Sequence, residues 1–246
     1  MIMRAVITGG TGGIGLSTAL ELGKAGYEII ITGIDQEAAD GALKTLSDNG
    51  VKAEFFYADS MKEEDVNKCF AEIAGKYDSL DVLVNNVGGL GGRQRFEEME
   101  TSFMRRVMAL NFDSAFFASR AAIPLLKKGA HPSIINYSTI AVTSGGGPGA
   151  GIYAASKAAI EGLTRGLAKD LAEYGIRVNA VSPGTIDTPF HSATKREILE
   201  SWKDGILMKR LGDPSEVATV IEFLVSEKAS FITGEVVQIN GGQVFI

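Results

Sequence analysis

A tyrosine and a lysine four residues apart are the clearest chemical feature of this chain. They stand in GIYAASKAAIEG (151–162), where Tyr153 precedes Lys157 among alanines, which favour helix. On a helix, residues i and i+4 share one face, with Cβ atoms about 5–6 Å apart. A neighbouring ammonium favours the phenolate, so we expect it to lower the tyrosine pKa from about 10 towards the working range of an acid–base catalyst. The spacing alone is weak evidence for catalysis, and further motifs must support it.

A glycine-rich loop near the N-terminus is the second feature. TGGTGGIG (8–15) follows a short apolar run and precedes a helical pattern. Glycines let the backbone approach a pyrophosphate, and the N-terminus of the following helix offers free N–H groups and the positive end of its dipole. The spacing is not GxGxxG, and the Lys-Ser/Thr ending of a triphosphate loop is absent. The sequence predicts a dinucleotide site with contacts from Gly9, Thr11, Gly12, Gly13, Ile14 and Gly15.

Strand-like and helix-like segments alternate along the whole chain. Seven short apolar runs are typical of strands buried on both faces, as in a parallel sheet: 4–8, 28–32, 53–58, 81–85, 133–138, 177–182 and 235–240. Segments with apolar residues at helical spacing lie between them, including 14–25, 36–49, 62–76 and 214–226. No linker or repeat interrupts the alternation. We therefore expect residues 1–246 to form one doubly wound α/β domain with helices on both faces, its N-terminal half binding the cofactor and its C-terminal half supplying the chemistry.

Composition excludes several classes of protein. The formal net charge of −6 has no block of like charge, which argues against a nucleic-acid or anionic-membrane partner. The single cysteine, Cys69, rules out an intrachain disulfide and fits a reducing compartment. No apolar run reaches 18 residues, and the N-terminus lacks a signal-peptide pattern. We expect a cytoplasmic protein that binds no metal.

Four motifs in order resemble the short-chain dehydrogenase/reductase family. They are TGxxxGIG at 8–15, NNVG at 85–88, YAASK at 153–157 and PGTIDT at 183–188, and the resemblance extends to the closing FITGEVVQINGG. It implies a seven-stranded parallel Rossmann-type sheet, a nicotinamide cofactor and a homotetramer in which helices 102–127 and 153–174 contact neighbouring subunits. Tyr153 then looks like the acid/base, Lys157 its partner and holder of the nicotinamide ribose, and Asn111 the support of a proton-relay water.

The catalytic hydroxyl departs from the family pattern. Where relatives close the fifth strand with N-x-S-S, this chain reads Asn136-Tyr137-Ser138-Thr139. Alternation along a strand lets only one of the two hydroxyls face the substrate easily. The register favours Thr139, and Ser138 remains the alternative. The chosen hydroxyl would donate to the substrate oxygen as negative charge develops there.

The resemblance also implies further cofactor contacts. They are Gly33, Ile34, Asp35, Asp59 beside the adenine, Ser60, Asn86 near the adenosine ribose, Gly88, Pro183, Gly184, Ile186 and Thr188, which would hold the carboxamide, together with Tyr153 and Lys157. Relatives specific for NAD place an acid where this chain has Gly33, and relatives specific for NADP place a base at Ile34 or Gly12. Neither pattern is complete. Because no base awaits a 2′-phosphate, we favour NAD over NADP; Asp35 either reaches the ribose or caps the next helix.

The substrate is predicted from the chemistry of the motifs and from the residues at the borders of the pocket. We expect hydride transfer between a ketone or aldehyde and its alcohol, on a small polar substrate such as a sugar, a keto-uronate or an oxo acid. Residues 189–205 are expected to act as a mobile lid, and the basic residues at the borders of the pocket suit a carboxylate: Arg93, Arg95, His191, Lys195 and Arg196. The alternatives are a 3-oxoacyl-thioester reductase and a cofactor-binding sensor that performs no chemistry.

Overall fold

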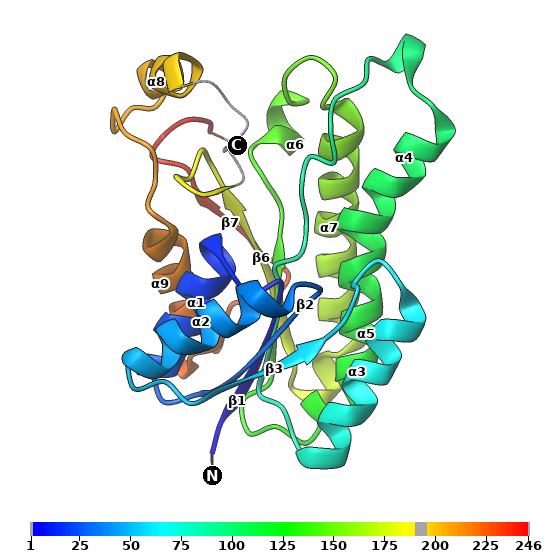
Figure 1. Cartoon of the computed structure of the whole chain (residues 1–246), viewed down its shortest axis with the longest axis vertical. Coiled ribbons are helices and arrows are strands. Elements are labelled where there is room, and N and C mark those ends of the chain that lie inside the picture. The colour runs from blue at the N-terminus through cyan, green and yellow to red at the C-terminus, as the bar shows by residue number, and fades with distance from the viewer. Residues whose placement is uncertain (1, 190–195, 246) are drawn as a thin grey trace.

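Seven parallel strands form one sheet at the centre of the molecule (Figure 1). The computed structural model describes residues 2–189 and 196–245. The strand order is β3-β2-β1-β4-β5-β6-β7. The strands are β1 (Arg4–Thr8), β2 (Glu28–Gly33), β3 (Ala53–Tyr57), β4 (Val82–Asn85), β5 (Ser133–Tyr137), β6 (Arg177–Pro183) and β7 (Val236–Ile239). All seven predicted runs form strands, and the predicted Rossmann-type fold is confirmed.

Helices cover both faces of this sheet (Figure 1). One layer holds α1 (Gly13–Lys24), α2 (Gln36–Asp48) and α9 (Pro214–Val225). The other holds α3 (Glu63–Lys76), α5 (Ser114–Leu126) and α7 (Gly151–Asp170), with α4 (Thr101–Met108) alongside α7. Two shorter helices, α6 (Ala141–Ser144) and α8 (Arg196–Asp204), lie beyond the carboxyl ends of the strands. Single 3-10 turns complete the described structure at η1 (Phe96–Glu98), η3 (Ala172–Tyr174) and η5 (Glu227–Ala229).

Side-chain alternation along the strands explains the two layers. In β1, Ala5 and Ile7 join the apolar cluster under α1 and α9, whereas Val6 joins the cluster under α3 and α5. All three are fully buried. Successive side chains of a strand point to opposite faces, so a strand that is apolar at every position needs cover on both sides. The continuous apolar runs therefore select the doubly wound arrangement.

The predicted helix over 102–127 is interrupted near its middle. Between α4 and α5 the chain forms a π-helical turn, η2 (Ala109–Asp113). The helix predicted over 153–174 likewise ends at Asp170 and closes with a 3-10 turn. π turns insert one extra residue and often occur at functional positions. The apolar periodicity located the helices but did not show the extra residue.

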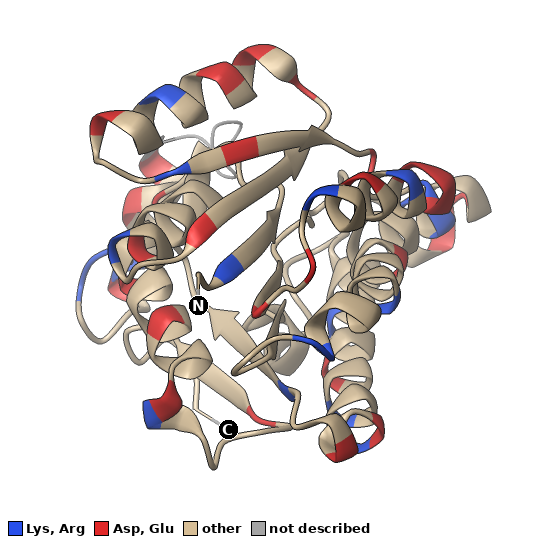
Figure 2. Ribbon diagram, turned by 90° about the horizontal axis from the view of Figure 1, so that it is seen from below, with Lys and Arg blue, Asp and Glu red and all other residues tan. Residues whose placement is uncertain are grey.

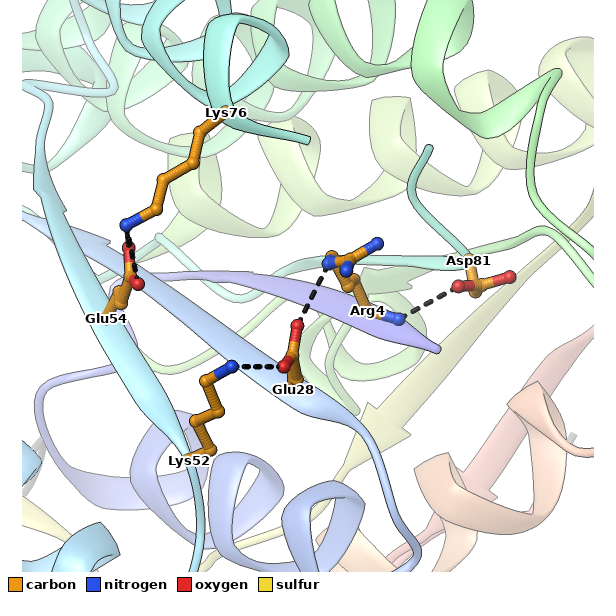
Figure 3. Close-up of polar contacts among 6 residues, drawn as sticks. All are labelled: Arg4, Glu28, Lys52, Glu54, Lys76 and Asp81. Atoms are coloured by element: carbon orange, nitrogen blue, oxygen red, sulfur yellow. Dashed lines mark hydrogen bonds and ion pairs between the residues drawn. The ribbon is translucent and has the colours of Figure 1, made fainter. Parts of the chain in front are cut away.

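A network of charged groups ties the amino ends of the first strands together (Figure 3). Glu28 accepts from Arg4 Nε at 3.0 Å and also pairs with Lys52, while Lys76 pairs with Glu54. The buried Asp81 accepts from the backbone N–H groups of Arg4 and Ala130, at 2.8 and 2.9 Å. These contacts join β1, β2, β3 and the entry to β4 at the edge where these strands begin.

Positively and negatively charged residues are interspersed along the helices and strands (Figure 2). Cys69 is buried in α3, and desolvation raises the pKa of its thiol to about 12, so it is an unreactive core residue.

None of the helices described is long and apolar enough to cross a membrane. Within 2–189 and 196–245 there is also no group of three or more His, Cys, Asp or Glu residues that would hold a metal ion.

Candidate active site

The glycine loop and the start of α1 form an open cradle at the carboxyl end of β1. Gly9 has φ +62°, a backbone conformation that favours glycine, and it lets the chain turn sharply out of the strand. The N-cap residue Gly12 provides no side-chain hydrogen bond to the first turn, and the space where its Cβ would stand is open. The first N–H groups of α1 are therefore left for an anion.

The amide of Asn86 holds this loop in shape. Its Nδ2 donates to the carbonyls of Thr8 and Gly9, at 3.0 and 2.9 Å. A Cβ added at Gly15 would lie 2.6 Å from that nitrogen and 2.6 Å from the Gly9 carbonyl oxygen, so only glycine fits there. Asn86 was predicted to lie near the adenosine ribose. In the structure its amide nitrogen is hydrogen-bonded to the glycine loop. A role at the ribose stays a prediction.

Tyr153 and Lys157 lie on α7 and face the carboxyl end of β5. Lys157 Nζ donates to the Tyr137 carbonyl oxygen at 2.9 Å, and the lysine side chain is buried. Burial lowers its pKa from 10.5 to about 8. Burial also raises the pKa of Tyr153, and a hydrogen bond with Thr139 opposes that rise. The expected lowering of the Tyr153 pKa is therefore not found in the structure, because desolvation of the phenolate is the dominant effect.

Ser138 and Thr139 follow the end of β5, and their side chains have different partners. Thr139 Oγ1 accepts from the Ala141 N–H at 3.3 Å, and its hydroxyl meets the phenol of Tyr153. Ser138 is buried, and its Oγ donates to Glu161 Oε1 on α7 at 2.7 Å. The structure thus brings Thr139 to the acid/base candidate and engages Ser138 elsewhere. Glu161 was not predicted as a site residue, although it lies four residues beyond Lys157 on the same helix.

Asn111 lies in the π-helical turn η2 and is fully buried. Its Nδ2 donates to the carbonyls of Val107 and Gly89, both at 2.9 Å, and its Oδ1 accepts from the Gly89 N–H at 2.9 Å. A Cβ added at Gly88 would lie 2.9 Å from both Asn111 Oδ1 and Lys157 Nζ. The loop after β4 can therefore run between these two side chains only as glycine.

The residues expected to contact the adenosine lie at the end of β2 (33–35) and just after β3 (59–60), and none of them is Lys or Arg. A Cβ added at Gly33 would stand 3.4 Å from Thr11 Cγ2, and Ile34 is exposed. Asp35 caps α2, since its Oδ1 accepts from the Ala38 N–H at 3.1 Å. Asp59 accepts from the Met61 N–H and pairs with Lys62 at 3.2 Å. Its neighbour in the chain, the predicted contact Ser60, is buried.

The loop after β6 closes the site from the other side. Thr188 packs over the cradle, since a Cβ added at Gly13 would lie 3.8 Å from the threonine Cβ. Ile186 is buried and bridges to Gly212. After Pro183, Gly184 packs against the C-terminal segment, where a Cβ would meet Gln243 Oε1 at 2.8 Å.

These parts enclose one cavity of about 640 Å³. Four of the five predicted catalytic residues line it: Ser138, Thr139, Tyr153 and Lys157. Nine further predicted cofactor contacts do so as well: Gly12, Gly13, Ile14, Asn86, Gly88, Pro183, Gly184, Ile186 and Thr188. Gln243 also lines the cavity and was not predicted as a contact. Of the predicted lid, residues 190–195 lie outside the described residues, and α8 contributes Trp202.

The cavity suits a nicotinamide dinucleotide. At one place it offers a glycine cradle with uncapped helix N–H groups, as a pyrophosphate requires. At another it offers a phenol, a hydroxyl and a buried ammonium, the set needed to handle a carbonyl oxygen and its proton. Fold and site together define a nicotinamide-dependent oxidoreductase of the Rossmann type.

Comparison with known proteins gives the family. The profile of a family described as "Enoyl-(Acyl carrier protein) reductase" matches residues 9–243. The 3-oxoacyl-[acyl-carrier-protein] reductase FabG of Aquifex aeolicus (strain VF5) is 37% identical over 239 residues, 97% of this chain and 96% of the relative. The chain therefore belongs to the short-chain dehydrogenase/reductase family of NAD(P)-dependent oxidoreductases.

Two solved structures extend the comparison. The NADH-dependent reductase A1-R′, described as responsible for alginate metabolism, has a TM-score of 0.91 and 34% identity, with 100% of this chain and 98% of that chain covered. A Pseudomonas aeruginosa RhlG/NADP active-site complex has a TM-score of 0.91 and 32% identity, with 98% and 96% covered. Similar chains of this fold are thus described with either cofactor.

Proposed function

We propose that this protein interconverts a carbonyl compound and its alcohol, with Tyr153 as the acid/base and Thr139 as the hydroxyl that binds the reacting oxygen. One observation carries the proposal: the Thr139 hydroxyl meets the Tyr153 phenol in the same cavity that the buried ammonium of Lys157 lines. Ser138 is assigned a structural role, because its hydroxyl is engaged by Glu161.

In the proposed reduction, Thr139 and Tyr153 bind the substrate oxygen. When bound, the nicotinamide supplies the hydride that the carbonyl carbon accepts. The Tyr153 phenol gives its proton to the oxygen, which becomes the alcohol hydroxyl, and the Thr139 hydroxyl stabilises the negative charge during that transfer. Lys157, with a pKa of about 8, is an ammonium at pH 7 and favours the phenolate left behind. Asn111 holds the loop after β4, and a supporting water there would serve to return the proton.

NAD is the proposed cofactor in preference to NADP. Gly33 and Ile34, at the end of β2, carry no charge that would pair with a 2′-phosphate. The carboxylate of Asp35 lies at the start of the next helix and would repel one. The cofactor contacts assigned by the sequence, from Gly9 to Thr188, belong to this same proposal.

A second candidate is the reduction of 3-oxoacyl thioesters. The relative from Aquifex aeolicus that matches nearly the whole chain is named for that activity. Against it, we favour a small polar substrate, because Arg93 and several hydroxyl groups line the cavity among apolar side chains such as Ile140 and Trp202. A sensor without chemistry has no support from the intact tyrosine and lysine pair.

The test is a cofactor titration followed by a carbonyl screen. NADH and NADPH are titrated separately against wild type and Tyr153→Phe, and oxidation of the reduced cofactor is then followed with ketones, sugars, oxo acids and acetoacetyl thioesters. We expect tighter binding of NADH, and a loss of turnover of roughly 10²–10⁴ in the variant with cofactor affinity unchanged. Equal turnover by wild type and Tyr153→Phe would contradict the assigned role.

We also propose the setting in which the protein works. Residues 1–246 act as a single domain in the cytoplasm, and four copies assemble without a nucleic-acid or membrane partner. The tetramer is proposed from the resemblance to the family. Light scattering after size exclusion measures the assembly.

A further inference from the structure

The charged residues that line the cavity are all cationic. Among the described residues they are Arg93 and Lys157, and no Asp or Glu is present in the lining. Lys157 is explained by its place beside Tyr153. Arg93, which follows the glycine segment after β4, has no part in the proposed chemistry. The protein has a net charge of −6, so the position of the Arg93 cation in the cavity wall needs an explanation other than the overall charge.

Arg93 is held in place by the loop that leads to Tyr153. Its Nη1 donates to the Pro148 carbonyl oxygen at 3.1 Å, and the next residue, Gln94, donates its N–H to the Gly149 carbonyl oxygen at 3.1 Å. A Cβ added at Gly149 would lie 3.0 Å from Arg93 Cβ, so glycine there makes room for the arginine. Residues 147–149 thus contact both the guanidinium and the backbone around Arg93.

The phosphates of a dinucleotide do not account for this arginine. The uncapped N–H groups suited to a pyrophosphate belong to the turn at Gly12 and Gly13, over which Thr188 packs. Arg93 instead adjoins Gly147 and Pro148, in the loop between α6 and α7. That loop runs directly into Tyr153, so Arg93 stands at the part of the cavity where a substrate meets the acid/base.

We propose that Arg93 is a specificity-determining residue and that the substrates are carbonyl compounds bearing a carboxylate. This inference rests on the proposed carbonyl–alcohol function. Pro148 is the only hydrogen-bond partner of Arg93 within the described residues, and it engages one nitrogen of the guanidinium. The remaining donors form a planar pair that matches the two oxygens of a carboxylate. The carboxylate anchors one end of the substrate while Thr139 and Tyr153 bind its carbonyl oxygen.

The experiment measures binding without turnover. Trp202 is the only tryptophan of the chain and lines the cavity, so its fluorescence reports ligand there. With the protein saturated by oxidised NAD, no hydride is available for a ketone, and acetoacetate and acetoacetamide form ternary complexes that differ in one charge. Both probes are titrated against wild type, Arg93→Gln and Arg93→Lys. The matched control is Arg95→Gln, which removes an exposed charge two residues away that does not line the cavity.

We expect wild type to bind acetoacetate about tenfold more tightly than the amide, since the contact is charge-assisted but open to water. Arg93→Gln should remove the preference, Arg93→Lys should restore part of it, and Arg95→Gln should keep it. Equal affinities in wild type, a preference that survives in Arg93→Gln, or no response to either probe would overturn the inference. Unchanged NAD affinity and thermal unfolding in Arg93→Gln exclude misfolding as the cause.

Turnover separates this inference from the function on which it rests. Reduction of ketones by NADH or NADPH with no preference for the carboxylate leaves the proposed function standing and overturns the role of Arg93. Conversely, Arg93-dependent binding of acetoacetate with no reduction of any carbonyl contradicts the proposed function and supports the anion site alone.

Discussion

The polar groups at the two ends of the parallel strands differ in whether they have partners within the chain. We refer to the end where the strands begin as the amino edge and to the end where they finish as the carboxyl edge. At the amino edge, Arg4, Glu28, Lys52 and Asp81 pair with one another or with the backbone (Figure 3). At the carboxyl edge, the loops are rich in glycine, and the first turn of α1 has no side-chain cap. The charges named at the amino edge are paired within the chain, whereas the carboxyl edge leaves the first N–H groups of α1 for a ligand.

This difference separates stability from function within one fold. Polar groups that pair with each other stabilise the strands they join. A binding site instead keeps hydrogen-bond donors without protein partners, which lowers the stability of the unliganded protein. The cost is visible at Lys157, whose burial lowers its pKa to about 8. Substitutions at the carboxyl edge should therefore change activity more than stability, and those at the amino edge the reverse.

The largest expected effect distinguishes the two neighbouring hydroxyls of the carboxyl edge. Thr139→Ala removes the proposed donor to the reacting oxygen and should lower kcat by roughly 10²–10³. Ser138→Ala removes the hydrogen bond to Glu161 and should cost stability with a much smaller change in kcat. Steady-state kinetics and chemical unfolding of both variants measure the contrast. A larger loss of kcat in Ser138→Ala would reverse the assignment.

At the amino edge, Asp81→Asn should act on stability alone. The carboxylate of Asp81 accepts two backbone N–H groups while buried, and an amide nitrogen would face one of those donors. We expect the free energy of unfolding to fall by about 1–3 kcal/mol, with kcat/KM unchanged. Urea denaturation and kinetics on the same preparation measure this. A loss of activity that exceeds the fraction unfolded would show that the edges are coupled.

The last expected effect is a pH dependence of stability from Lys157. In the unfolded chain the lysine keeps its proton up to about 10.5, whereas in the folded protein it releases it at about 8. Between these values the unfolded state binds more protons, so stability rises with pH by at most roughly 1.4 kcal/mol per unit. Below about pH 8 the full penalty of the buried charge is present.

Denaturation of wild type and Lys157→Met across pH 7 to 10 measures this contribution. The variant lacks the buried charge, so the difference in stability should shift in favour of wild type as the pH rises. Lys169→Met, which removes an exposed lysine on the same helix, is the matched control. A difference for Lys157→Met that does not change with pH would contradict the lowered pKa.

Much of the fold could be predicted because its signals are local. Each predicted apolar run forms a strand. The cradle could also be located, because glycine in a strand-to-helix turn has few other uses. The catalytic hydroxyl could be narrowed to Ser138 or Thr139, with the register favouring Thr139, and that choice stays a prediction.

Features that depend on distant contacts could not be predicted. Gln243 reaches the cavity because β7 pairs with β6, which no local pattern reveals. The direction of the Tyr153 pKa depends on how deeply the phenol is buried, whereas spacing shows only which side chains are neighbours. The bond from Ser138 to Glu161 likewise needs the packing of α7 against β5.

The π-helical turn at Ala109–Asp113 contains one residue more than a regular helical turn, so the rotation of α4 relative to α5 depends on the number of residues in this turn. Loss of one residue there would let α4 and α5 join as a regular helix. The residues before the deletion would then rotate by about 100° relative to the residues after it. Asn111 would no longer meet both Val107 and Gly89. The extra residue therefore fixes the rotation of α4 relative to α5. Through Asn111 it also fixes the position of the loop after β4, which enters the site.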